Sequence, residues 1–107
     1  MKINIKTSNP NALKNAIFSK ANDGKLETWA IRKGINNNQY LTHTPDQWED
    51  KALIEIASFN ERLDITVNRW EGRSKPTAQE EGICIGRFVE VLLNHFQDYF
   101  DNILIIK

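Results

Sequence analysis

Apolar residues recur at helical spacing over the last third of the chain, from residue 77 to residue 100. Residues three or four apart lie on the same side of a helix, so this spacing predicts one wide apolar stripe. The stripe comprises Ile85, Phe88, Val89, Leu92, Phe96, Tyr99 and Phe100. Thr77, followed three residues later by Glu80, has the pattern of a capping box at a helix start. We therefore predict a long, largely buried helix and expect the rest of the chain to pack against it.

Strands are predicted where apolar and polar residues alternate, or where a short apolar run stands alone. These stretches are Met1–Thr7, Leu26–Lys33, Gln39–His43, Ala52–Phe59, Leu63–Trp70 and Ile103–Ile106. The turn at residues 60–62 makes the fourth and fifth stretches antiparallel neighbours. The continuous apolar run Ile103–Ile106 predicts a final strand that is covered on both faces and lies beside the first strand.

A second helix is predicted between residues 9 and 24. Asn9 suits the N-cap, Pro10 suits the first helical position, and Gly24 suits the C-terminal stop. The fold class that follows is α+β, with a mostly antiparallel five- or six-stranded sheet and two main helices packed on one face. A chain of 107 residues is large enough to bury a core, and we expect residues 1–107 to form a single domain.

The charge of the chain is balanced, with 14 Lys and Arg against 14 Asp and Glu. A nucleic-acid binder normally carries a basic excess, so the balance argues against that class of function. No apolar run is long enough to span a membrane, and the first residues lack the apolar segment of a secretory signal. We therefore expect a cytoplasmic protein, which the single cysteine also favours.

Cys84 and His95 are the residue types of a nucleophile and its base. Eleven residues of one helix would hold them roughly 16 Å apart, beyond hydrogen-bonding distance. We interpret Cys84 as a core residue and His95 as a boundary residue. The motifs of metal and cofactor sites are absent from the sequence, so we predict no metal, no cofactor and no enzymatic activity. A site that folding assembles from His43, His95 and carboxylates stays open.

Gly82 and Gly86 lie four residues apart within the predicted C-terminal helix. Each glycine costs about 1 kcal/mol of helix propensity, so a close approach of another backbone should offset the cost. That backbone belongs either to the sheet of the same chain or to another chain, for example in a homodimer. A third interpretation is that the helix begins only after these glycines.

Trp48 is surrounded by Asp46, Glu49 and Asp50. An exposed aromatic ring among carboxylates suits a binding hot spot for a basic partner. The alternative is that Trp48 folds back over an edge of the core.

A second tryptophan, Trp70, is followed by Glu71 and Arg73, which are further candidate contacts with a partner. Arg69, Arg73 and Lys75 beside an aromatic ring would also suit single-stranded nucleic acid, where stacking and phosphate contacts combine. A solvated loop is the simpler interpretation of the same stretch.

One segment carries a resemblance to a known family. It reads Trp70-Glu-Gly, Pro76, then Gly82-x-x-x-Gly86-Arg87-Phe88-x-Glu90-x-Leu92-Leu93-x-His95-Phe96. This segment, about a quarter of the chain, resembles bacterial immunity proteins of contact-dependent growth inhibition and other polymorphic toxin systems. The resemblance implies an inhibitor that binds a cognate toxin C-terminal domain, often a nuclease, and covers its active site. Antidotes to basic nucleases are commonly acidic, so the zero net charge leaves the class of toxin open.

Overall fold

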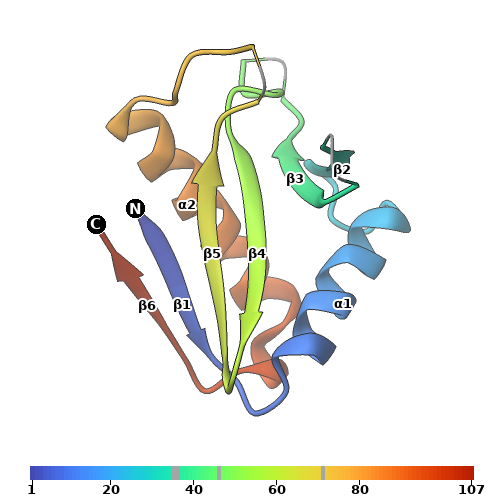
Figure 1. The fold of residues 1–107 in the computed structure, drawn as a ribbon. Helices are drawn as coiled ribbons and strands as arrows, with labels where there is room; N and C mark the ends of the chain where they lie inside the picture. Colours follow the sequence, from blue (N-terminus) through green and yellow to red (C-terminus); the bar gives the residue numbers. More distant parts are fainter. Residues whose placement is uncertain (35–36, 46, 71) are drawn as a thin grey trace.

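The computed structural model describes residues 1–34, 37–45, 47–70 and 72–107. Within these residues, six strands, two α-helices and one short 3-10 helix follow one another along the chain (Figure 1). They are β1 (Lys2–Lys6), α1 (Pro10–Asn22), β2 (Trp29–Lys33), β3 (Gln39–His43), β4 (Leu53–Phe59), β5 (Arg62–Asn68), α2 (Ala78–His95), η1 (Gln97–Tyr99) and β6 (Asn102–Ile106).

The strands form one sheet in the order β2-β3-β4-β5-β1-β6. Every neighbouring pair is antiparallel. β1 lies between β5 and β6, with Ile3 opposite Ile65 on one side and opposite Ile105 on the other. The α+β class and the mostly antiparallel sheet are therefore confirmed.

Both helices bury their apolar sides in a single core cluster with one face of the sheet. α1 contributes Leu13 and Ile17, and α2 contributes Phe88 and Leu92, all fully buried. Figure 1 shows α2 crossing behind β4 and β5, with α1 beside it. The capping box at Thr77 and Glu80 starts α2 as predicted. In the described part of the chain, neither helix is long and apolar enough to cross a membrane.

Two predicted element ends are wrong by several residues. The strand predicted from Leu26 begins at Trp29, because the Trp29 N–H bonds to the Leu26 carbonyl in a tight turn that buries Leu26. The apolar stripe runs on to Phe100, but α2 ends at His95 and a 3-10 turn follows. The apolar spacing in the sequence continues past the end of the helix because the following turn buries Phe96 against the same core.

Two further expectations need correction. β6 lies beside β1 as predicted, yet it is an edge strand rather than a covered one, and Leu104 and Ile105 are 57% and 50% exposed. The glycines of α2 do not meet the sheet backbone either. Among described atoms, a Cβ on Gly82 would meet only the Met1 side chain at 3.9 Å, and one on Gly86 would meet nothing within 4 Å.

Candidate partner-binding surface

The two stretches that the sequence singled out lie at the same end of the sheet. The loop at 44–52 joins β3 to β4, and the loop at 69–77 joins β5 to α2. Because Leu53 pairs with Thr42 on one side and with Asn68 on the other, these loops leave from adjacent strand ends. Figure 1 shows them together at the top of the molecule. We call this region the loop end. Asp46 and Glu71 lie outside the described residues.

The turn that carries Trp48 is tied to two strands. The Trp48 and Glu49 N–H groups both bond to the Pro45 carbonyl, at 2.7 and 3.0 Å, which closes a helical turn. The Asp50 N–H donates to the Thr42 hydroxyl at 2.9 Å, and the Asp50 carboxylate lies 3.2 Å from Arg32 Nε. Asp50 is therefore a structural anchor as well as a candidate contact.

The exposed fractions sort the predicted contacts into two groups. Glu49 and Arg73 are exposed, whereas Trp48, Asp50 and Trp70 are partly buried. Arg73 follows Gly72, whose φ of 80° lies in the left-handed region that suits glycine. The Arg73 N–H closes this turn by donating a hydrogen bond to the Trp70 carbonyl at 3.0 Å. Glu49 and Arg73 are thus the charges most available to a partner.

Sequence reasoning missed a basic hollow on the β5–β1–β6 side of the loop end. One depression of about 390 Å³ is lined by Met1, Lys2, Thr66, Val67, Lys75, Glu81, Ile106 and Lys107. A second, of about 220 Å³, adds Arg69 and shares Lys75 and Glu81 with the first. Glu81 is held by the N-terminal amine at 3.2 Å. Lys2 and Lys107 come from opposite ends of the chain, and only the pairing of β1 with β6 brings them together.

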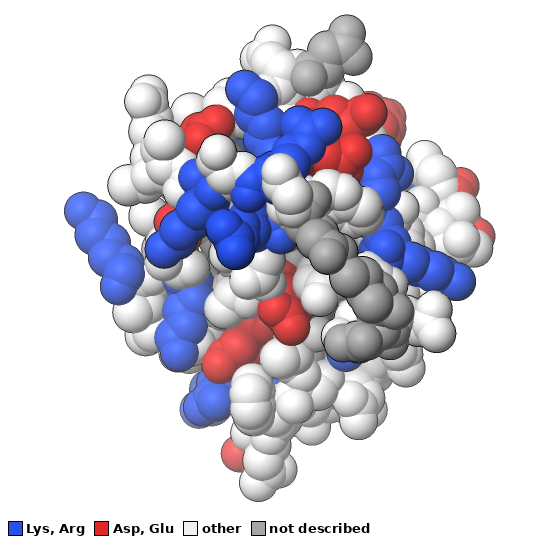
Figure 2. Space-filling view, turned by 45° about the horizontal axis from the view of Figure 1, so that its top comes forward, with Lys and Arg blue, Asp and Glu red and all other residues white. Residues whose placement is uncertain are grey.

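The loop end therefore carries exposed charges of both signs, although the chain is neutral as a whole. Glu49 and Asp50 lie in the loop between β3 and β4, together with the exposed Lys51 and with Arg32, which pairs with Asp50, whereas Lys2, Lys75 and Lys107 line the hollow on the β5–β1–β6 side together with Glu81. Figure 2 shows Lys and Arg over the left and centre of this face, a compact group of Asp and Glu at its upper right beside further basic side chains, and more acidic side chains at the upper left and below the centre. Exposed charges of both signs attract and orient a partner whose charges have the complementary pattern.

The sheet face opposite the helices is polar near its centre. Asp64 is only 9% exposed there, with Arg62 Nε at 2.8 Å and Lys2 Nζ at 3.9 Å from its carboxylate. The contact with Arg62 is an ion pair whose angle falls outside hydrogen-bonding geometry, so Asp64 Oδ1 accepts no hydrogen bond from the described residues. The positive charges of Arg62 and Lys2 nevertheless compensate the negative charge of the Asp64 carboxylate.

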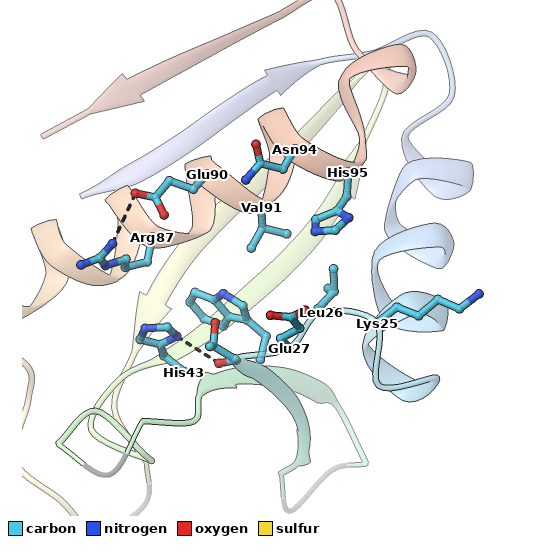
Figure 3. Close-up of a pocket in the computed structure, with 11 residues that line it drawn as sticks. Lys25, Leu26, Glu27, His43, Arg87, Glu90, Val91, Asn94 and His95 are labelled. Atoms are coloured by element: carbon cyan, nitrogen blue, oxygen red, sulfur yellow. Dashed lines mark hydrogen bonds and ion pairs between the residues drawn. The ribbon is translucent and has the colours of Figure 1, made fainter.

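A separate pocket lies between α2 and the residues around β2, and it brings His43 and His95 to one cavity of about 240 Å³ (Figure 3). His43 Nδ1 lies 3.0 Å from the Thr28 carbonyl and must carry the proton, so Nε2 is the acceptor in the neutral ring. Burial is the main cause of a lowered His43 pKa, which the hydrogen bond to Thr28 opposes and the Arg87 charge reinforces.

The two histidines of this pocket lie apart across the cavity. Figure 3 shows their rings on different sides of the cavity, with Val91 and Glu27 between them. Among the described residues, no group of three or more His, Cys, Asp or Glu side chains could hold a metal ion. Cys84 is buried in the core, and burial, with a smaller effect of the Glu81 charge, raises its pKa to about 12. The thiol therefore stays protonated and is not an activated nucleophile.

No family model, curated protein or solved structure matches the chain. Fold and surface together define a small α+β protein whose loop end exposes charges of both signs.

Proposed function

We propose that this protein is an inhibitor of the immunity type, which binds a cognate toxin C-terminal domain in the bacterial cytoplasm and neutralises it by protein–protein contact. The observation that carries the proposal is the loop end, where exposed charges of both signs lie beside two tryptophans. The exposed Glu49 in the loop between β3 and β4, and the exposed Arg73 and Lys75 in the loop between β5 and α2, offer both signs of charge to one partner. This arrangement favours a folded protein partner over a uniform polyanion.

The anchoring of the loop end supports the same role. Contacts that form before binding lower the entropy lost on binding, and Asp50 of this loop is already held by Arg32 and Thr42. The partly buried Trp48 and Trp70 lie beside exposed charges, which is the usual composition of a binding hot spot. On a nuclease toxin, Glu49 and Asp50 of the loop end would lie against the basic cleft that holds the substrate phosphates.

The proposal is tested by neutralisation. The genes that flank this one in its host are searched for a toxin C-terminal domain, which is expressed from an inducible promoter with or without this protein while growth is followed. We expect growth to be restored only by this protein, and the two purified chains to elute together as a stoichiometric complex. Toxicity that persists in the presence of folded inhibitor, with no complex formed, contradicts the proposal.

The basic hollow favours a second candidate function, binding of nucleic acid. Lys2, Arg69, Lys75 and Lys107 surround two adjoining depressions, and the partly buried Trp70 follows Arg69 in the chain. Phosphate contacts release counterions, so binding to a random single-stranded oligonucleotide would weaken steeply as salt is raised. Binding of that kind without toxin neutralisation would favour this candidate over the first.

A further inference from the structure

The two edge strands of the sheet differ in how they face solvent. Within the described residues, β2 pairs only with β3, and β6 pairs only with β1. β2 carries Arg32 and Lys33, and charged residues of this kind protect a free edge from association. β6 reads Asn-Ile-Leu-Ile-Ile and has no charge or proline. It therefore presents unpaired backbone groups and exposed apolar side chains together.

The side chains of β6 are divided between the two faces of the sheet. Ile103 and Ile105 pair with Ile5 and Ile3, so they lie on the face that the helices cover. Leu104 points to the opposite face, because side chains alternate along a strand. Any strand that adds to β6 must match apolar residues on both faces.

We propose that the occupant of this edge is β6 of a second copy of the chain. The two strands pair antiparallel about a two-fold axis perpendicular to the sheet, with Leu104 opposite Leu104 of the second copy. This symmetry keeps the helix-covered faces on the same side and joins two six-stranded sheets into one.

On the helix-covered face, the sequence of β6 and its flanks is self-complementary in this register, whereas on the other face Leu104 lies opposite itself and Asn102 lies opposite Ile106 of the second copy. On the helix-covered face, Ile103 lies opposite Ile105 of the second copy, and the exposed Asp101 lies opposite the exposed Lys107. The two-fold axis generates each of these pairs twice. Opposite charges and apolar pairs directly across an antiparallel ladder are both stabilising.

Other registers lose this match. A shift of two residues places Asp101 or Lys107 directly opposite an isoleucine of the second copy. A shift of one residue sets a residue of the helix-covered face against one of the other face, which the pleat does not allow in this symmetry. The charge pair at the two ends of β6 therefore specifies the register centred on Leu104.

The test is the dissociation constant of the dimer, measured on the full chain by sedimentation equilibrium. Asp101→Lys and Lys107→Asp each place like charges opposite one another at two symmetric sites, and each should weaken the dimer roughly tenfold. The double variant D101K/K107D exchanges the charges and should restore an affinity close to the original one. Leu104→Lys should give a monomer, and circular dichroism verifies that each variant is folded.

Gly86→Lys is the matched control, because this exposed site on α2 has open space around it among the described atoms. It should leave a β6-mediated dimer unchanged. A wild-type chain that stays monomeric at concentrations on the order of 1 mM overturns the proposal. So does a dimer that Gly86→Lys breaks and Leu104→Lys preserves, or a double variant that is no tighter than the two single ones.

Discussion

Replacing Asp50 separates two contributions that hold the turn between β3 and β4. Its carboxylate pairs with Arg32 at 3.2 Å, with the two side chains 24% and 30% exposed, and its φ is 58°. Asp50→Asn keeps the shape and the tolerance for a left-handed backbone but removes the charge, which should cost about 0.5–1 kcal/mol. Asp50→Ala also loses that tolerance and should cost about 1 kcal/mol more.

Urea unfolding followed by circular dichroism measures both losses of unfolding free energy. The comparison holds if the slope of unfolding free energy against urea concentration is the same in every variant. Each kcal/mol corresponds to a shift of about 4 °C in Tm for a chain of this size. Arg32→Gln should cost as much as Asp50→Asn, and combining the two should add little, because both remove the same ion pair. Equal losses for Asn and Ala would refute the backbone contribution, and no loss for Asn would refute the ion pair.

Two more predictions concern buried titratable groups. Because burial lowers the pKa of His43, the unfolded chain takes up the proton first, so stability is full above about pH 6.5 and falls as the pH drops below it. His43→Gln should flatten the decline in unfolding free energy between about pH 7 and pH 5; an unchanged slope contradicts this. Cys84, with its pKa raised to about 12, should react with iodoacetamide at about pH 8 only in urea, and fast labelling of the folded protein would contradict its burial.

The parts of the fold that depend on local pattern were predictable. The capping box at Thr77, Pro10 at the start of α1 and the alternation along β5 each act within a few residues. The environment of β6 was not, because a short apolar run looks the same at a covered centre and at an exposed edge. β6 lies at the edge because β1 pairs with β6 on one side and with β5 on the other. The pairing of β1 with β5 joins residues that are far apart in the sequence.

The candidate surface was predictable only in part. Glu49 and Arg73 were singled out and are exposed. The ion pair between Asp50 and Arg32 connects residues that are 18 positions apart. The basic hollow is lined by both Lys2 and Lys107. Neither feature could be found from local spacing in the sequence. A signal existed for the hollow, since the expected pairing of the first and last strands already implied that their ends would meet.

The most direct test of the account is the rate at which this protein associates with the toxin domain, measured by stopped flow at several salt concentrations. Glu49→Lys changes an exposed charge at the loop end, and Asp98→Lys makes the same change at an exposed residue of η1. We expect Glu49→Lys to slow association roughly tenfold and to flatten its salt dependence, with Asp98→Lys unchanged from the original protein. Equal rates for both variants, or no association at any salt concentration, would contradict partner binding by the loop end.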